Sequence, residues 1–252
     1  GDASLRSRKR ERHQHIADAI RARAPWLSET LNQGLERVRR LRIRLLPRTT
    51  KQAYIDGALR KIHGRAPHPS LGSNISEESK RKALNTFHYL LRQSIRREDV
   101  VVDYGCGTLR VGQHWINYLE PGRYIGFDLD HRIFEAGLAA LNPDALSQKQ
   151  PRCLEITPDN LRLAAELKPS LVFAKGVLQH VAPEDLGEFF ANLASLSTNA
   201  LVLAALKPSE STRRLSERSW IHGRDDVLQA SGQAGLELIH SQGIWHHFRR
   251  KG

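Results

Sequence analysis

Short apolar runs alternate with longer stretches of helical periodicity from Glu98 to about residue 206. The apolar runs are typical of buried strands, and the stretches between them repeat apolar residues every three or four positions. Strands that alternate with helices of about 10–15 residues indicate βαβ units and a parallel sheet covered on both faces. The expected strands are 99–104, 122–130, 152–156, 170–175 and 199–206, and the expected helices are 108–120, 131–142, 158–167 and 182–196.

The pattern changes after the fifth expected strand. Residues 225–235 have helical periodicity, and residues 236–250 contain two strand-like runs separated by Gln242 and Gly243. A short turn between two such runs is typical of a hairpin. We therefore expect the C-terminal pair to bring an antiparallel strand into an otherwise parallel sheet.

A different pattern occupies the N-terminal part of the chain. Apolar residues recur at spacings of three and four between Leu31 and Leu45, with arginines between them, and Pro47 ends the run. This spacing predicts an amphipathic basic helix. Three interpretations stay open: the leucines pack on the main domain, the helix lies on an anionic membrane surface, or its arginines bind the phosphates of a nucleic acid.

Positive charge is concentrated in the same N-terminal region. The chain has a formal net charge of +12, and its first 50 residues hold 13 of the 39 Lys and Arg residues but 5 of the 27 Asp and Glu residues. Residues 63–82 are rich in proline, glycine and serine, which predicts a substrate lid or a linker, and a helix should start near Ser76. We therefore expect a basic helical segment with this loop over 1–95 and a second domain over 96–252.

Composition argues against several classes of protein. Cys106 and Cys153 are the two cysteines and lie far apart in sequence, so neither a disulfide framework nor a thiolate zinc site is expected. His63 and His68 have no carboxylate or thiol at metal-ligand spacing. No stretch approaches the roughly 18 apolar residues of a membrane-spanning helix. These features predict a cytoplasmic location, at the membrane periphery if the basic helix binds lipid.

The sequence VVDYGCGTLR, residues 101–110, places two glycines directly after the first expected strand. Gly105 and Gly107 allow a tight turn and the close approach of a ligand, and ligands of open parallel sheets lie beyond the carboxyl ends of the strands. Arg110 stands where a dinucleotide-binding motif needs its third glycine, and no GKS or GKT is present. Asp128 ends the next strand, where a carboxylate can accept both hydroxyls of a ribose. Together these features indicate a site for an adenosine without phosphates.

Three stretches, VVDYGCG, YIGFDLD and LVFAKGVLQHVAPEDL, resemble the class I S-adenosylmethionine-dependent methyltransferases. The resemblance covers the chain from about Asp99 to Lys251. It implies an α/β fold with a Rossmann-like seven-stranded, mostly parallel sheet and a C-terminal antiparallel hairpin, preceded here by the basic helical segment. It also implies a methyltransferase that uses S-adenosyl-L-methionine as its cofactor.

The resemblance assigns roles to particular residues. The first glycine loop would lie on the methionine side of the cofactor, with Cys106 as a small, inert residue facing it, and Asp128 would hold the ribose. The adenine would lie near residues 157–160. Leu109 departs from the family's common D-x-G-x-G-x-G pattern, because it replaces the third glycine. The implied cofactor-binding residues are Asp103, Gly105, Cys106, Gly107, Asp128, Leu129, Thr157 and Lys175.

The residues after the fourth strand of this family usually face the transferred methyl group. Here they are Lys175, Gly176, Gln179 and His180. The pKa of a histidine side chain lies near neutral pH, so His180 can act as a general base. The histidine of such a VLQHV stretch is also often structural, so both roles stay open. The implied catalytic residues are His180 and Lys175.

Missing motifs narrow the methyl acceptor. The D/N-P-P-Y/F stretch of many base and amide N-methyltransferases is replaced by AKGV, neither cysteine has a Pro-Cys context, and Lys175 stands where metal-dependent catechol-type enzymes have an aspartate. The sequence therefore favours metal-free O-methylation of a small molecule or a glycan. The alternatives are an RNA methyltransferase with the arginine-rich helix as its phosphate-binding arm, and a non-catalytic cofactor-binding scaffold.

Overall fold

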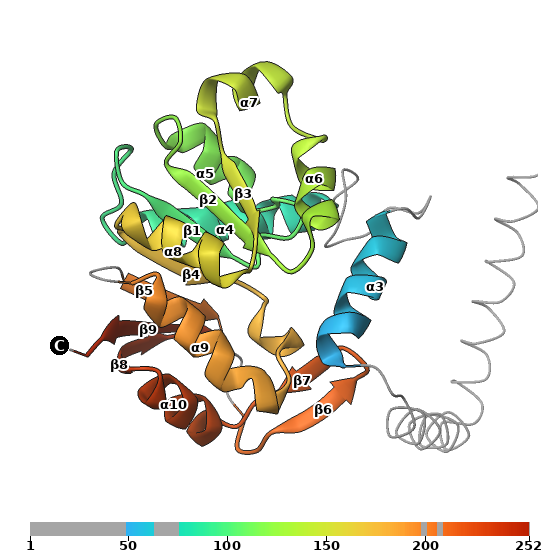
Figure 1. Cartoon of the computed structure of the whole chain (residues 1–252), viewed down its shortest axis with the longest axis vertical. Helices are drawn as coiled ribbons and strands as arrows, with labels where there is room; N and C mark the ends of the chain where they lie inside the picture. The colour runs from blue at the N-terminus through green and yellow to red at the C-terminus, as the bar shows by residue number, and fades with distance from the viewer. Residues whose placement is uncertain (1–48, 63–75, 198–200, 206–208, 252) are drawn as a thin grey trace, which may run out of the picture. The chain divides into compact units, whose positions relative to one another are not determined.

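The computed structural model describes residues 49–62, 76–197, 201–205 and 209–251 (Figure 1). The expected leucine- and arginine-rich helix and most of the loop over 63–82 lie outside the described residues. Among the residues that the structure describes, no helix is long and apolar enough to cross a membrane.

A seven-stranded sheet forms the centre of the described structure, in the order β3-β2-β1-β4-β5-β9-β8. Its first five strands run parallel to one another, as expected. The order reverses between β1 and β4, so the carboxyl ends of these two strands form the switch point where ligands of such sheets bind. The strands of this sheet are β1 (Val101–Tyr104), β2 (Tyr124–Asp128), β3 (Arg152–Glu155), β4 (Leu171–Ala174), β5 (Leu201–Ala205), β8 (Leu236–Gln242) and β9 (Trp245–Arg250).

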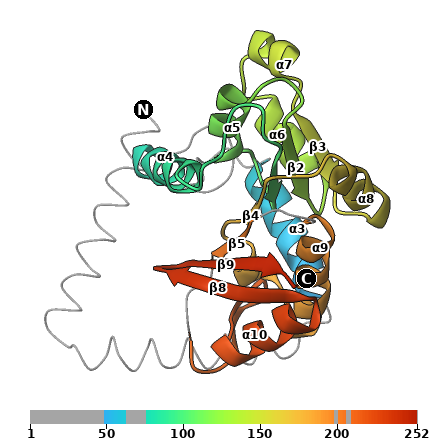
Figure 2. The same ribbon diagram turned by 90° about the vertical axis from the view of Figure 1, so that its left-hand side faces the viewer.

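Helices cover both faces of the sheet (Figures 1 and 2). One hydrophobic core joins the sheet to α8, α9 and α10, and the other joins it to α4, α5 and α6. Val101 and Val102 point to opposite faces and are both fully buried, which explains why β1 is continuously apolar. The described helices are α3 (Thr50–Ile62), α4 (Glu77–Leu91), α5 (Gly112–Tyr118), α6 (His131–Leu138), α7 (Pro143–Lys149), α8 (Pro158–Glu166), α9 (Leu186–Ser195) and α10 (Arg224–Gln233), with 3₁₀ turns η1 (Leu178–His180) and η2 (Pro183–Asp185).

The expected C-terminal hairpin is confirmed. β8 and β9 are antiparallel, and β9 also pairs antiparallel with β5 (Figure 2). Gly243 has φ +60°, a left-handed conformation that glycine adopts readily, and it lies in the turn between the two strands. The expected helix start near Ser76 is confirmed as well, because the Ser76 hydroxyl caps α4 by accepting a hydrogen bond from the Ser79 N–H at 3.3 Å.

The structure contains elements that the sequence pattern did not predict. A second hairpin, β6 (Arg213–Ser216) and β7 (Ser219–Ile221), lies between β5 and α10. The Trp220 indole on β7 donates a hydrogen bond to the Thr50 hydroxyl on α3 at 3.1 Å. Figure 1 shows α3 next to α6 and this hairpin, and α3 contacts both α6 and η1.

Residues from Arg48 to Gly252 form one compact unit. The boundary expected between residues 95 and 96 stays a prediction. Phe87 and Leu90 of α4 are buried in the core formed with α5 and α6, and Thr50 and Ala53 of α3 are buried too.

Candidate active site

A tight turn follows β1 and is tied to β2. Gly105 and Gly107 have φ values of +82° and +57°, in the left-handed region that favours glycine. The backbone N–H groups of Gly105 and Cys106 both donate to the carbonyl oxygen of Phe127 at 2.8 Å. Leu109, which replaces the third glycine of the family pattern, also has a left-handed φ of +60°. The turn therefore keeps a glycine-like backbone at this position in spite of the leucine side chain, which is fully buried.

Asp128 lies at the carboxyl end of β2, next to this turn. Its carboxylate is 2% exposed and accepts hydrogen bonds from the backbone N–H groups of Gly107 and Leu129, each at 2.8 Å. Burial raises the pKa of Asp128 to about 6, although the two N–H groups oppose that change. Each carboxylate oxygen has two acceptor positions, so the side chain can still accept hydrogen bonds from a ligand.

A pocket lies at the carboxyl ends of β1, β2 and β4. Residues of α3 and of the first turns of α9 complete its wall. Of the residues expected from the sequence, Gly105, Asp128, Leu129, Gly176 and His180 line this pocket. The full lining consists of Lys51, Tyr54, Tyr104, Gly105, Asp128, Leu129, Ile156, Gly176, Val177, His180, Val181, Asp185, Glu188, Phe189 and Asn192.

Two other expected residues of the glycine loop point into the core beneath the sheet. Asp103 accepts a hydrogen bond from the Tyr124 hydroxyl at 3.0 Å, and burial raises its pKa to about 7. Cys106 belongs to the core formed with α4, α5 and α6, and a side chain at Gly126 would meet its sulfur at 3.0 Å. Burial raises the pKa of the Cys106 thiol, so a reactive thiolate is disfavoured. Cys106 therefore lies in the core and does not line the pocket.

Thr157 has a structural role at the rim of the site. Its hydroxyl caps α8 by accepting a hydrogen bond from the Asn160 N–H at 3.3 Å. The neighbouring Ile156, which the sequence did not single out, lines the pocket. Its N–H donates to the Asp128 carbonyl oxygen at 2.9 Å and holds the end of β3 beside β2.

Lys175 follows β4 but is not among the residues that line the pocket. Its ammonium group lies 5.9 Å from the centre of the Trp245 ring, and Trp245 stacks on Tyr89 of α4. Burial lowers the pKa of Lys175, and the positive charges of Arg110 and Lys82 lower it further. The Lys175 side chain thus belongs to a partly buried group of cations and aromatic rings, whereas Gly176 directly after it lines the pocket.

His180 lies at the end of η1 and lines the pocket. Its Nδ1 is 2.6 Å from the carbonyl oxygen of Arg218. A carbonyl oxygen accepts and cannot donate, so Nδ1 carries a proton and Nε2 is the basic nitrogen of the neutral ring. Burial lowers the pKa of His180, so the ring is neutral at pH 7. The hydrogen bond from Nδ1 to a backbone carbonyl oxygen is typical of a structural histidine. The position of the ring in the pocket and its unprotonated Nε2 also suit a general base.

Tyr54 on α3 is the main pocket residue that the sequence did not reveal. Its ring centre lies 4.8 Å from that of His180, and the side chain lines the pocket together with Asp128. Burial raises the pKa of the Tyr54 hydroxyl, and the negative charge of Asp128 raises it further. Tyr54 therefore remains protonated and can donate a hydrogen bond into the pocket. No motif marks it, because it comes from a helix far away in the sequence.

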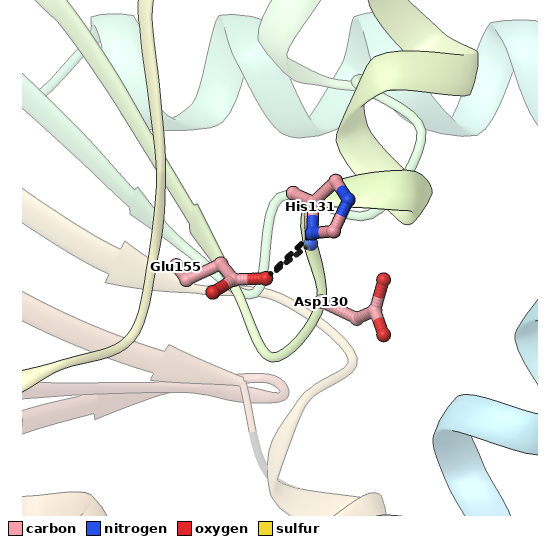
Figure 3. Close-up of side chains that lie close together, drawn as sticks. All are labelled: Asp130, His131 and Glu155. Carbon is pink, nitrogen blue, oxygen red and sulfur yellow. Dashed lines mark hydrogen bonds and ion pairs between the residues drawn. The ribbon is translucent and has the colours of Figure 1, made fainter.

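A polar cluster lies beyond β2 and β3 (Figure 3). The ligand atoms of Asp130, His131 and Glu155 are within 4.8 Å of one another, which is close enough to hold a metal ion. The His131 Nδ1 is 2.9 Å from the Glu155 carboxylate, and Arg132 pairs with Asp130 at 2.6 Å. The Arg132 cation would compete with a metal for Asp130. The expectation that the protein uses no metal stays a prediction.

Comparisons with known proteins place this geometry in a known fold. No family model matches the chain, and no curated protein matches it. Among solved structures, magnesium protoporphyrin IX methyltransferase from Synechocystis PCC 6803 with bound S-adenosylmethionine is similar over 80% of this chain and 95% of that chain, with 15% identity and a TM-score of 0.53. The PH0226 protein from Pyrococcus horikoshii OT3 is similar over 77% of this chain and 98% of that chain, with 12% identity and a TM-score of 0.52.

At these identities the similarity is one of fold. The described part of the chain therefore has the fold of the class I S-adenosylmethionine-dependent methyltransferases, as the sequence resemblance predicts.

Proposed function

We propose that the protein is an S-adenosylmethionine-dependent methyltransferase that methylates a hydroxyl oxygen of a small molecule or a glycan without a metal ion. The observation that carries the proposal is the buried Asp128 carboxylate, which lines a pocket beside the Gly105 turn at the carboxyl end of the sheet. The similar Synechocystis methyltransferase was solved with bound S-adenosylmethionine, which supports the same cofactor here.

The residues of the pocket fit the adenosine part of this cofactor. Asp128 would accept hydrogen bonds from the two ribose hydroxyls, and its burial makes each such hydrogen bond stronger than it would be in water. Leu129 and Ile156 offer apolar side chains to the adenine, with Thr157 capping the helix next to it. Gly105 lets the backbone approach the methionine part closely. Asp103 and Gly107 support this turn from beneath, through their hydrogen bonds to Tyr124 and Asp128.

The activated methyl group is supplied by S-adenosylmethionine, so the task left to the chain is to position an acceptor and remove its proton. His180 is our candidate general base. The hydrogen bond from Nδ1 to the Arg218 carbonyl orients the ring, and Nε2 accepts the hydroxyl proton. The Gln179 side-chain nitrogen lies 3.2 Å from the same Nε2, so an acceptor hydroxyl would have to displace this contact.

Lys175 has a supporting role in this proposal. Its position against Trp245 keeps a positive charge next to the residues that follow β4. That charge can stabilise the carboxylate of the cofactor or an anionic acceptor, and it gives Lys175 a binding role in preference to proton transfer.

A labelling experiment tests the proposal and its alternatives. The chain is incubated with methyl-labelled S-adenosylmethionine and with separated small-molecule, glycan, lipid, RNA and protein fractions, and Asp128→Asn serves as the matched control. We expect label in the small-molecule or glycan fraction, and far less with the variant. Label in RNA would favour the nucleic-acid alternative, and cofactor binding without label in any fraction would favour the scaffold.

A further inference from the structure

Two cations lie beside His180, outside the residues that line the pocket. Lys61 is in the last turn of α3, and Arg218 is in the turn between β6 and β7. Both side chains are partly buried. The turn that carries Arg218 is held at His180, since the Arg218 carbonyl oxygen accepts the 2.6 Å hydrogen bond from Nδ1.

The backbone of α3 makes room for Arg218 at Gly57. A Cβ atom at Gly57 would lie 2.1 Å from Nη1 of Arg218, so the guanidinium lies directly against the helix. Residues four apart share one face of a helix, which places Lys61 one turn further along the face that Arg218 contacts. Tyr54, three residues before Gly57, lies on the same face, and its ring packs against His180 with the ring planes tilted by 41°. The two cations and His180 therefore meet where α3, η1 and the hairpin come together.

The charges in this group repel one another. Burial lowers the pKa of Lys61, and the positive charge of Arg218 lowers it further. The same two cations help to lower the pKa of His180. In the described part of the chain, no salt bridge includes Lys61 or Arg218. Partly buried cations that repel each other would be stabilised by an anion between them.

We propose that Lys61 and Arg218 bind an anionic group of the methyl acceptor, a carboxylate or a phosphate, beside His180. This inference rests on the proposed methyltransferase function and narrows its substrate class to hydroxylated anions. A guanidinium and an ammonium are the side chains that recognise such oxyanions best. The carboxylate of the cofactor has the same chemistry. The acceptor is the better assignment, because Lys61 and Arg218 are not among the residues that line the pocket with Gly105 and Asp128.

Inorganic phosphate is the probe that tests this site. It is titrated by NMR into the full chain saturated with S-adenosylhomocysteine, and the ring signal that disappears in His180→Gln is followed. We expect phosphate to raise the pKa of His180, because a nearby negative charge favours the charged ring. Lys61→Gln and Arg218→Gln should each weaken phosphate binding by roughly tenfold, the effect of losing one charge-assisted hydrogen bond.

Two variants provide matched controls. Arg60→Gln and Arg213→Gln remove the same charge from exposed positions on α3 and β6 and should change phosphate affinity by less than about twofold. An equal loss in all four variants would show an effect of net charge and would overturn the assignment. Unchanged phosphate binding in Lys61→Gln would also overturn the assignment. This variant keeps the contact between Arg218 and Gly57, so it still tests the site if Arg218→Gln fails to fold.

Cofactor measurements separate the two sources of the anion. If Lys61 and Arg218 bind the cofactor carboxylate, their variants will lose affinity for S-adenosylhomocysteine but not for methylthioadenosine, which lacks that carboxylate, and the proposal fails. If the wild-type chain binds no S-adenosylhomocysteine, the proposed function fails by itself. Phosphate titration of the cofactor-free chain then still decides whether Lys61 and Arg218 form an anion site.

Discussion

Gly105→Ala tests whether the turn after β1 is shaped by its backbone conformation and by close packing against the pocket wall. Gly105 has φ +82°, and a Cβ there would lie 2.2 Å from a methyl carbon of Val177, which lines the pocket. Gly107 has φ +57°, but a Cβ there meets no atom within 4 Å. The two glycines therefore form a matched pair in which one substitution adds a clash and the other does not.

The expected magnitudes follow from these contacts. A left-handed alanine costs about 1–2 kcal/mol, and the lower entropy of the unfolded chain returns about 0.4–1 kcal/mol, so Gly107→Ala should lower the free energy of unfolding by about 1 kcal/mol. Gly105→Ala adds overpacking of about 1–3 kcal/mol, for a total of about 2–4 kcal/mol. Gly105→Ala should also weaken cofactor binding, because Val177 must move.

Urea denaturation of the single variants, of Val177→Ala and of the double variant Gly105→Ala/Val177→Ala measures these effects. Removing the Val177 methyl groups should recover about 1–2 kcal/mol of the loss caused by Gly105→Ala, a coupling typical of residues in contact. If Gly105→Ala costs no more than Gly107→Ala, or if Val177→Ala gives no recovery, the reasoning about this turn is wrong.

Three further predictions concern the proton chemistry and the extent of the site. His180→Gln should lower turnover strongly with little change in cofactor affinity. Wild-type turnover should rise with pH and level off by about pH 7, because the pKa of His180 is lowered from 6.5 and the neutral ring is the base. If the variant shows the same pH profile as the wild type, His180 is not the general base. Removing residues 1–48 should change S-adenosylmethionine affinity by a few fold at most, whereas removing residues 1–57 should abolish or greatly weaken it, since Tyr54 lines the pocket; calorimetry that finds equal effects would refute this difference. The folded-state pKa of Asp103, about 7, exceeds its usual value of 3.8, so its contribution to stability is present below about pH 4 and is lost as pH rises through 7. In urea denaturation across this pH range, the free energy of unfolding should decline less in Asp103→Asn than in the wild type. An identical pH dependence in both proteins would contradict the assignment.

Local sequence patterns predicted the sheet and the glycine turn after β1 because both depend on neighbouring residues. β1 and β4 are buried on both faces, so their runs are continuously apolar. Gly105 and Gly107 mark positions with left-handed φ, which few other residue types occupy. Asp128 was found by its place at the end of the second strand, and its burial and hydrogen bonds agree with that position.

Two features of the structure depend on long-range packing and were not predicted from the sequence. Tyr54 reaches the pocket only because α3 contacts α6 and η1, and these contacts have no local signature. The β6–β7 hairpin was missed because its strands are short and partly exposed, so they lack an apolar run.

The orientation of side chains in turns was also beyond prediction. Cys106 was expected to face the cofactor, but the left-handed residues on either side of it direct its thiol into the core. Lys175 was expected at the reacting centre, yet its side chain lies against Trp245. Both residues lie one or two positions beyond the end of a strand, where the strand register no longer fixes the direction of a side chain.

Calorimetric titration of S-adenosylmethionine tests the central claim most directly. Wild-type protein is compared with Asp128→Asn, which keeps the shape of the side chain and removes its charge, and with Asp144→Asn, which makes the same change at an exposed position of α7. We expect the wild type and Asp144→Asn to bind alike and Asp128→Asn to bind at least about tenfold more weakly, since hydrogen bonds to a charged group are each worth roughly 1.5–3 kcal/mol. No binding by the wild type, or wild-type affinity in Asp128→Asn, would contradict the account.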